Sequence, residues 1–352
     1  MADSSVQGDP SVPQHLLKRC PAASPTPLRH APGLARLFGI ESLFLKDESQ
    51  RMGLGSFKAL GAAYVLAQDA SARLDTPQAE ATAEQMGEAL RGSVYTCASA
   101  GNHGLSLAAG ARAFGADAVI YLSQTVPEAF AERLRSYGAE VVRAGLTYEE
   151  SMAAAAEAAR RNSWTLLSDS SWPGYVSIPG RVMEGYLVMG AEVITELTEP
   201  PTHIFLQAGV GGLAAAMTAL FRARWGGLPT IVVVEPEAAP AIIESIRAGR
   251  AVTTTGPVST MGRLDCKAPS HIALAELARE ADWFVTITDS QCDATAKRIS
   301  EHGFFTTPSG AAGVSALHHA ASHPNDLGLT GTSRVLAFIT EGTETLSRLM
   351  PS

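Results

Sequence analysis

Short apolar, β-branched runs recur along the chain, and each is followed by a longer stretch rich in alanine. Runs of about four to eight such residues are typical of buried strands, whereas the longer stretches are typical of helices. The pattern predicts strands at Ser93–Cys97, Ala118–Leu122, Glu140–Arg143, Thr165–Ser168, His203–Gln207, Thr230–Glu235, Trp283–Thr286 and Val335–Ile339. It predicts helices at Gly104–Phe114, Tyr148–Arg160, Gly180–Thr198 and Leu213–Arg224. This alternation indicates an α/β fold with open, mostly parallel sheets that helices cover on both faces.

Two stretches depart from this pattern. Residues Gln68–Arg91 are polar and rich in Ala and Glu, which predicts a helical insertion on the surface. Residues Arg250–Ser270 contain Thr, Gly and Pro without periodicity, which predicts a loop over a site. The length of 352 residues favours two domains.

The composition is that of a globular protein, with 46% hydrophobic and 18% charged residues. The formal net charge of −8 argues against a nucleic-acid partner, because phosphate backbones are bound by clustered Lys and Arg. A small anionic ligand stays compatible, since a few local donors outweigh the global charge at short range.

The four cysteines, Cys20, Cys97, Cys266 and Cys292, are scattered without CxxC spacing. We therefore expect reduced thiols, with neither a disulfide framework nor a metal site. No apolar run approaches the ~20 residues that span a bilayer, so we expect no membrane partner. The N-terminus is polar and lacks a signal pattern, and we expect a cytoplasmic protein.

The first candidate for chemistry is Lys58, which follows the glycine-containing stretch Gly53–Phe57 and begins the helical run Ala59–Ala67. Ser56 is a candidate N-cap. A lysine in the first turn opposes the helix dipole, which suits an amine whose pKa must fall so that it can attack a carbonyl. The alternative is a solvated surface lysine, and the motif alone favours it.

The second candidate is the Ser-Ala-Gly-Asn-His-Gly sequence of residues Ser99–Gly104, directly after the predicted strand Ser93–Cys97. A turn of small residues between strand and helix exposes backbone N–H groups at the positive helix end. Such a turn can bind a carboxylate, with the Asn102 amide beside a cofactor ring. The alternative is an ordinary turn.

The third candidate is the glycine-rich Gly209–Leu213, between the strand His203–Gln207 and a helix, an arrangement typical of phosphate binding. The full G-x-G-x-x-G of dinucleotide-binding loops is not present, which disfavours NAD. A fourth candidate is Thr340, at the end of the last predicted strand, where α/β folds bind ligands. Its hydroxyl could hydrogen-bond a pyridine nitrogen, although polar caps on strands are common.

These motifs occur in one order: a lysine, Ser-Ala-Gly-Asn-His, a glycine-rich loop and a Thr-containing strand end. The order resembles the fold-type II (tryptophan-synthase-β-like) pyridoxal-phosphate (PLP) enzymes, which include serine and threonine dehydratases and cysteine synthases. The chain is most similar to diaminopropionate ammonia-lyases at Lys46–Ser49, Gly53-Leu54, Phe57–Gly61, Ser168–Trp172, Gly174-Tyr175 and Ile178-Pro179. The resemblance runs from about Pro25 to Thr343.

The resemblance implies a large PLP-binding domain of residues 1–60 and 180–352, and a smaller, mobile substrate domain of residues 61–179. It implies that Lys58 holds PLP as a Schiff base and that Asp169 shuttles a proton, as the second catalytic residue. Cofactor contacts would come from Asn102 beside the 3-hydroxyl, Thr340 at the pyridine nitrogen, and Gly209, Val210, Gly211, Gly212 and Leu213 around the phosphate. The substrate carboxylate would lie against Ser99, Ala100, Gly101 and His103.

The chain departs from the ammonia-lyases in two places. They carry an aspartate where this chain has Ala100, and because that aspartate serves the D-substrate, we expect a preference for L-amino acids. The loop Gly262–Pro269 carries Arg263 and Lys267 where the ammonia-lyases are more neutral. Four residues apart, these cations could face one anionic group, which would point to an acidic substrate side chain such as that of hydroxyaspartate. The alternative is that both are simply solvated.

The implied function is that of a PLP-dependent lyase of the ammonia-lyase class. It would eliminate across Cα and Cβ of a small, diaminopropionate-like 2,3-substituted amino acid, giving a 2-keto acid and ammonia. Alternatives are a serine/threonine or 3-hydroxyaspartate dehydratase, a β-replacement synthase and, from another class, a non-catalytic or NAD-type binder. We expect a homodimer, by resemblance and because twofold oligomers are common. Since the chain ends nine residues after Thr343, we expect no C-terminal regulatory domain.

Overall fold

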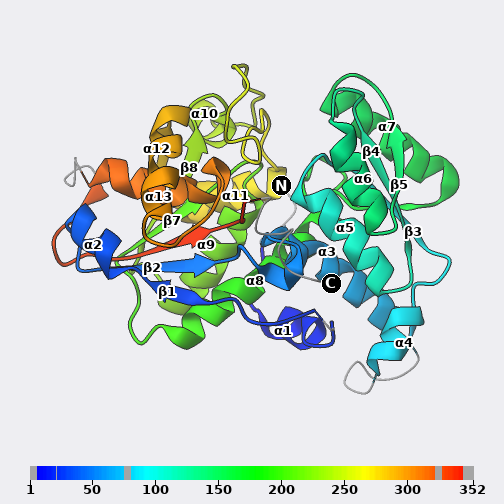
Figure 1. Cartoon of the computed structure of the whole chain (residues 1–352), viewed down its shortest axis with the longest axis horizontal. Helices are drawn as coiled ribbons and strands as arrows, with labels where there is room; N and C mark the ends of the chain where they lie inside the picture. Colours follow the sequence, from blue (N-terminus) through cyan, green and yellow to red (C-terminus); the bar gives the residue numbers. More distant parts are fainter. Residues whose placement is uncertain (1–5, 21, 75–80, 322–326, 344–352) are drawn as a thin grey trace.

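The computed structural model describes residues 6–20, 22–74, 81–321 and 327–343, and its strands form two sheets (Figure 1). The six-stranded sheet has the order β1-β2-β10-β7-β8-β9, and the four-stranded sheet has the order β5-β4-β3-β6. Neighbouring strands are parallel except β1 and β2. The prediction of an α/β fold with two largely parallel sheets is confirmed.

The eight predicted strands are all present, with ends shifted by at most two residues. They are β3 (Val94–Ala98), β4 (Asp117–Leu122), β5 (Glu140–Arg143), β6 (Thr165–Leu166), β7 (His203–Gln207), β8 (Thr230–Pro236), β9 (Trp283–Ile287) and β10 (Arg334–Ile339). Sequence analysis missed β1 (Leu28–His30) and β2 (Ser42–Asp47). The first has three residues and no buried position, and the second has only three consecutive apolar residues, Leu43–Leu45, so neither contains an apolar run of four or more.

The four predicted helices are confirmed as α5 (Asn102–Ala113), α7 (Tyr148–Asn162), α8 (Ser177–Glu196) and α9 (Gly212–Trp225). The other helical segments described are α1 (Ser11–Leu17), α2 (Pro32–Phe38), the 3₁₀ turn η1 (Arg51–Gly53), α3 (Lys58–Arg73), α4 (Ala83–Glu88), α6 (Glu128–Ser136), α10 (Ala241–Ala248), α11 (His271–Glu280), α12 (Asp289–Ser300) and α13 (Pro308–Ala320).

The two irregular stretches have different outcomes. Arg250–Ser270 contains neither helix nor strand, as predicted. For Gln68–Arg91 the predicted helical segment on the surface is confirmed for α4, where Glu84, Gln85 and Glu88 are exposed and Met86 is buried. It is wrong for Gln68–Arg73, which completes α3. Residues 75–80 of this stretch lie outside the described residues.

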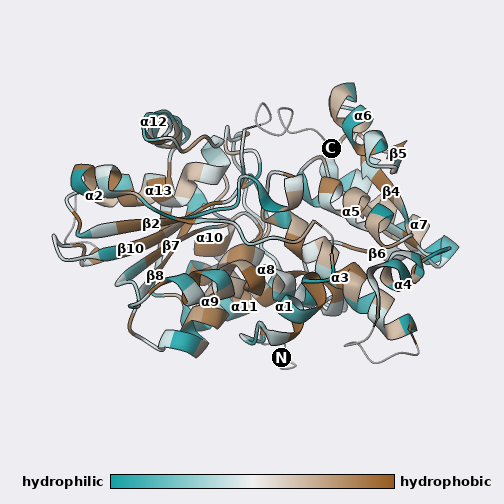
Figure 2. Cartoon of the chain, turned by 60° about the horizontal axis from the view of Figure 1, so that its bottom comes forward, coloured by the Kyte–Doolittle hydropathy of each residue, from teal (hydrophilic) through white to brown (hydrophobic). Residues whose placement is uncertain are grey.

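Alternate residues of the central strands of the six-stranded sheet point to opposite faces, as its parallel architecture requires. Ile204 and Phe338 pack in one core with side chains of α8, α9 and α11. Phe205 and Ala337 pack in a second core with side chains of α2 and α13. Figure 2 shows the hydrophobic colouring concentrated along these strands and on α8. Both faces are covered, which leaves the strand ends and the loops to form a site.

Helix α3 joins the two halves of the molecule. It packs on α5, beside the four-stranded sheet, and on α8, beside the six-stranded sheet. A Cβ atom on Gly185 would lie 2.6 Å from the Leu60 carbonyl oxygen, and one on Gly61 would lie 2.8 Å from Cε1 of Tyr186. Two glycines therefore let the backbones of α3 and α8 approach closely, which brings Lys58 near α8.

The domain boundaries predicted at residues 60/61 and 179/180 fall inside α3 and α8, and they stay a prediction. Among the described helices, none combines the length and the hydropathy of a membrane-spanning segment. The described residues contain no group of three or more His, Cys, Asp or Glu side chains arranged to hold a metal ion.

Candidate active site

Lys58 is the first residue of α3 and projects from a short turn after β2. Phe57, not Ser56, occupies the N-cap position, although Ser56 Oγ accepts the Lys58 N–H at 3.3 Å. The turn is joined to the end of β10, because the Phe57 N–H donates to the Thr340 carbonyl oxygen at 3.2 Å. Strand ends and helix start therefore fix the position of this lysine together.

The Lys58 side chain forms an ion pair with Asp169, at 2.6 Å between Nζ and Oδ2, and the two side chains are only 20% and 18% exposed. The alternative of a solvated surface lysine is therefore wrong. Asp169 follows β6 in the segment that leads to α8. His103 lies on its other side, with Nδ1 4.0 Å from Oδ2 of Asp169. His103 Nε2 bonds the Leu167 carbonyl oxygen at 2.8 Å.

The charges of this pair stabilise each other. Burial alone would lower the pKa of Lys58, but the negative charge of Asp169 outweighs it and raises that pKa above the ordinary value. Burial alone would raise the pKa of Asp169, but Lys58 and His103 outweigh it and hold that pKa well below the usual range. The expectation of a lowered lysine pKa is therefore wrong for this arrangement, because the carboxylate more than offsets burial.

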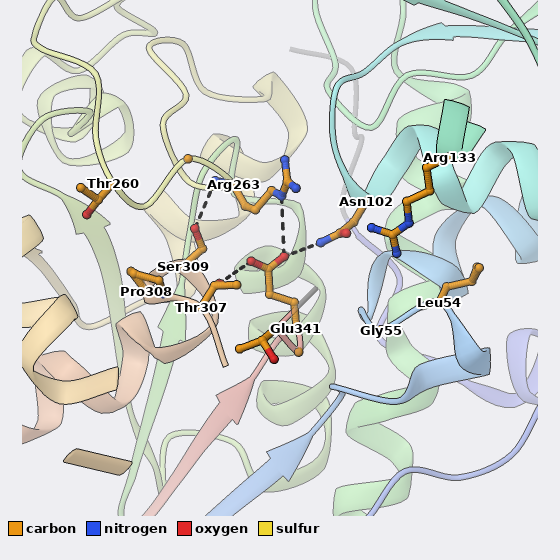
Figure 3. A pocket seen from close by; sticks show the side chains of 13 residues that line it. Leu54, Gly55, Asn102, Arg133, Thr260, Arg263, Thr307, Pro308, Ser309 and Glu341 are labelled. Carbon is orange, nitrogen blue, oxygen red and sulfur yellow. Dashed lines mark hydrogen bonds and ion pairs between the residues drawn. The ribbon is translucent and has the colours of Figure 1, made fainter. Parts of the chain in front are cut away.

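The turn Ser99–Gly104 connects β3 to α5, whose N-cap is Gly101. Ser99 Oγ accepts the N–H groups of Gly101 at 3.3 Å and Gly104 at 3.1 Å. A Cβ atom on Gly104 would lie 2.7 Å from the Ser99 carbonyl oxygen, so the tight turn depends on this glycine. Asn102 projects across to the six-stranded half and donates its side-chain N–H to Glu341 (Figure 3).

The glycine-rich loop Gly209–Leu213 connects β7 to α9, and Gly211 has φ +98°, a conformation that favours glycine. No acceptor is assigned within the described structure to the N–H groups of Gly211, Gly212 and Leu213, which lie at the N-terminus of α9. A Cβ atom on Gly209 would lie 3.0 Å from Sγ of Cys266, and one on Gly212 would lie 3.7 Å from Cε2 of Tyr186. The loop therefore lies beside the residues that surround Lys58.

Two residues that follow β10, Thr340 and Glu341, also belong to the site. Thr340 is buried, and its Oγ1 accepts from Gln207 Nε2 at 3.2 Å. Glu341 is buried as well and accepts from Thr307 Oγ1 and from the Asn102 amide (Figure 3). Burial raises the pKa of Glu341, although Thr307, Arg263 and Asn102 act in the opposite direction.

The two cations of the irregular loop lie in different surroundings. Arg263 faces the site, where its Nη1 donates to the Ala100 carbonyl oxygen at 3.0 Å. Lys267 Nζ is held at 2.8 Å by the Ala238 carbonyl oxygen, at 2.9 Å by that of Pro257 and at 2.6 Å by the Asp265 carboxylate. The structure therefore brings Arg263 to the pocket and uses Lys267 to fix the loop.

Sequence analysis missed several residues of the site. One of them is Glu341, next to Thr340. An acidic residue so close to the end of a predicted buried strand is the sequence signal that could have identified it. Tyr186 lies beside Lys58, with 5.7 Å from Nζ to the ring centroid, and Cys266 contacts the glycine-rich loop. Arg133 lines the pocket from α6 and has no recognisable motif around it.

These residues fit pyridoxal phosphate, the group implied by the resemblance. The glycine-rich loop offers a cradle that Cβ atoms would fill and free N–H groups at a helix N-terminus, which suit a phosphate. Lys58 provides a half-buried amine beside that loop, and Asn102 and the buried Thr340 provide further polar groups.

Comparisons with known proteins agree with this arrangement. The model of the family described as "Pyridoxal-phosphate dependent enzyme" matches residues 20–341. The chain is 31% identical to diaminopropionate ammonia-lyase of Salmonella typhimurium over 351 residues, which cover 92% of this chain and 87% of that protein. It is 27% identical to a serine dehydratase-like protein of Mus musculus over 297 residues, which cover 83% and 81%.

A solved structure shows the same architecture. Diaminopropionate ammonia-lyase from Escherichia coli, in complex with D-serine, superposes with a TM-score of 0.89 at 26% sequence identity, covering 99% of this chain and 92% of that one. With the match to the family model over most of its length, the chain belongs to the pyridoxal-phosphate-dependent enzymes of fold type II.

Proposed function

We propose that this enzyme is an ammonia-lyase that acts on a 2,3-substituted amino acid of the diaminopropionate type. The reaction breaks the Cα–H bond and the bond between Cβ and its substituent, and the resulting enamine hydrolyses. For diaminopropionate, one water is consumed and the products are a three-carbon 2-keto acid and two molecules of ammonia. The single observation that carries the proposal is the buried Lys58–Asp169 pair beside the glycine-rich loop.

Lys58 is proposed to anchor the cofactor and later to move the Cα proton. Bound pyridoxal phosphate supplies an electron sink that spreads the negative charge which develops at Cα. The Lys58 amine, once displaced by the substrate amine, takes the Cα proton at close range. Asp169, 2.6 Å from Nζ, stabilises the ammonium that results.

Asp169 is proposed to serve the leaving group. Because it is buried, its carboxyl favours the protonated form whenever no cation lies beside it. It lies between Lys58 and His103, so it can receive a proton from one side and pass it to the departing β-amine. A hydroxyl at the position of Thr340, in place of a carboxylate, does not keep a pyridine nitrogen protonated, which suits elimination better than transamination.

The turn Ser99–Gly104 is proposed to hold the substrate α-carboxylate through N–H groups at the start of α5. Ala100 carries no acid to serve the opposite face of Cα, which favours the L-isomer. The D-serine bound to the Escherichia coli relative concerns that protein, which makes the pair of isomers an informative comparison here.

The test is a panel of L- and D-diaminopropionate, serine, threonine and 3-hydroxyaspartate, with keto acid and ammonia measured for each. For each L-diaminopropionate consumed, we expect one molecule of keto acid and two molecules of ammonia. We expect far less product from the D-isomer. A product that forms only after sulfide or an amine is added would instead identify a β-replacement synthase. No turnover of any member of the panel would refute the proposal.

A homodimeric assembly and a cytoplasmic location are further proposals. The first rests on the family resemblance and on the frequency of twofold oligomers. The second is supported by the cysteines, of which all four are free thiols. Light scattering of the purified holoenzyme and fractionation of the producing cells would test them.

A further inference from the structure

A pocket of about 300 Å³ opens between the two halves of the molecule, at the outer side of Asn102 and Glu341 (Figure 3). Its remaining wall includes two arginines. Arg263 comes from the irregular loop of the six-stranded half, and Arg133 comes from α6 of the four-stranded half. Both side chains point toward the same hollow.

Arg133 has no acceptor for its guanidinium among the described residues. The two other arginines nearby, Arg135 and Arg143, both pair with Glu128, at 2.6 Å and 2.7 Å. Arg133 is half-buried on the same helix and makes neither an ion pair nor a side-chain hydrogen bond within the described structure. A partly desolvated guanidinium without an anion is a position where an anionic ligand gains most.

Arg263 is already oriented toward the substrate turn. Its Nη1 donates to the Ala100 carbonyl oxygen at 3.0 Å, and a Cβ atom on Gly101 would lie 3.2 Å from the same nitrogen. Its backbone N–H donates to Ser309 Oγ at 3.1 Å. Nε lies 3.9 Å from the Glu341 carboxylate, which leaves other guanidinium N–H groups available to a ligand.

The charge of the pocket is positive, in a chain whose net charge is −8. Two guanidiniums face one carboxyl, and that carboxyl is already engaged by Thr307 and Asn102. The turn Ser99–Gly104 is proposed to bind the α-carboxylate of an amino acid. The arginines are therefore available to bind a second anionic group. Lys267, which sequence analysis paired with Arg263, is occupied by three oxygen acceptors, two from its own loop and the Ala238 carbonyl oxygen.

From these contacts we infer that the substrate carries a second carboxylate on the β-carbon side, which Arg133 and Arg263 bind from opposite halves of the molecule. This inference rests on the proposed elimination and narrows its substrate class: the preferred substrate carries a carboxylate on Cβ beside the leaving group, and diaminopropionate, which lacks that carboxylate, is the weaker substrate. A dicarboxylic substrate bridges the two halves, so its binding also favours closure of the site. The arginines select the substrate, whereas Lys58 and Asp169 carry the proton transfers.

The test uses two amino acids that share the same leaving group. Serine and 3-hydroxyaspartate both lose a β-hydroxyl and differ only in the β-carboxylate. We expect kcat/KM for L-3-hydroxyaspartate, measured over both diastereomers, to exceed that for L-serine by about 10- to 100-fold, because charge-assisted hydrogen bonds are stronger than neutral ones.

The Arg133→Gln variant tests the arginine itself, with Arg135→Gln as a matched control on the same helix. We expect Arg133→Gln to lower kcat/KM for 3-hydroxyaspartate by about 10-fold or more, chiefly through KM, and to leave serine within about threefold. Arg135→Gln should change neither. Circular dichroism of both variants confirms that each is folded.

The outcomes separate this inference from the proposed function. Equal kcat/KM for the two substrates, with turnover of both, would overturn the inference and leave the elimination intact. An equal loss on both substrates in Arg133→Gln would also overturn it, because the arginine would then bind the α-carboxylate. No turnover of any β-substituted amino acid would refute the proposed function. Competition of 3-hydroxyaspartate and of serine with a fluorescent substrate analogue would still show whether the enzyme binds the dicarboxylic compound more tightly.

Discussion

Two groups of charged side chains lie near the turn that precedes α3. They differ in how many hydrogen-bond and ion-pair partners each member has. The first group, here called the structural network, consists of Lys46, Glu48, Arg51 and Glu192. Arg51 Nε bonds Glu48 at 2.7 Å, its Nη2 bonds Glu192 at 2.7 Å, and Lys46 Nζ lies 2.6 Å from Glu192. The second group, here called the proposed catalytic pair, consists of Lys58 and Asp169.

The structural network holds its charges with several partners for each. Arg51 also bonds the Ser24 carbonyl oxygen at 2.9 Å and Thr26 Oγ1 at 2.8 Å, and its side chain is only 1% exposed. The proposed catalytic pair has one short contact, and each of its side chains is about one-fifth exposed. Removing one partner from a fully paired group of buried charges is costly, so such a group stabilises the local structure. A pair whose donors and acceptors are not all used can exchange partners and protons.

The largest effect that the comparison predicts is the loss of Lys58. Lys58→Ala should lower turnover of diaminopropionate by roughly 10⁴-fold, because the anchor and the base are removed together. The visible absorbance of the lysine-bound cofactor should disappear, while the midpoint of thermal unfolding changes little. A variant that keeps this absorbance would show that another amine holds the cofactor.

Asp169→Asn should have the next largest effect, lowering turnover by roughly 10²- to 10³-fold. Without the carboxylate, burial dominates and lowers the pKa of Lys58, so its amine becomes neutral at lower pH. Cofactor-free enzyme of this variant should therefore bind pyridoxal phosphate at a more acidic pH than the wild type. An unchanged pH dependence would show that Asp169 does not control the lysine.

Disturbing the structural network should affect stability instead. Arg51→Met leaves Glu48 and Glu192 buried with Lys46 as the only cation, which should lower the free energy of unfolding by about 3–5 kcal/mol. The control is Arg91→Met, since Arg91 pairs with Glu88 on the surface and its side chain is 76% exposed. Urea titration of both variants checks the difference, and equal stability of the two would contradict the assignment.

A smaller effect concerns Glu235, a buried carboxyl that has no cation beside it. It accepts the N–H groups of Ile242 at 2.7 Å and Ile243 at 2.8 Å, and burial raises its pKa to about 7. Because the folded pKa lies above the ordinary value of 4.5, its contribution to stability is complete below pH 4.5 and is lost as the pH rises through about 7.

Glu235→Gln removes this titration. The stability of the variant relative to the wild type should therefore increase by roughly 3 kcal/mol between pH 4.5 and 8, whatever its value at either end. Urea titrations of both proteins at several pH values provide the measurement. A difference that does not depend on pH would mean that Glu235 is ionised throughout this range.

Eight of the ten strands described, the helices α5, α7, α8 and α9, and the order of the motifs could be predicted from the amino-acid sequence. Period-two and period-3.6 patterns are local, and so are turns such as Ser99–Gly104 and Gly209–Leu213, where glycine is needed for close approach or positive φ. The family resemblance, confirmed by the comparisons, assigned the cofactor from these local motifs.

Which charged side chains meet could not be predicted from the sequence, because it depends on how distant segments pack. The pairing of Lys58 with Asp169 joins residues 111 positions apart, and it depends on the close approach of α3 and α8. Arg133 faces Arg263 because the two halves of the molecule lie opposite each other across the pocket, whereas Lys267, four positions from Arg263, turns back into its own loop. Spacing along the chain fixes which residues are available, but the direction of a side chain from an irregular loop is set by the hydrogen bonds and packing around it.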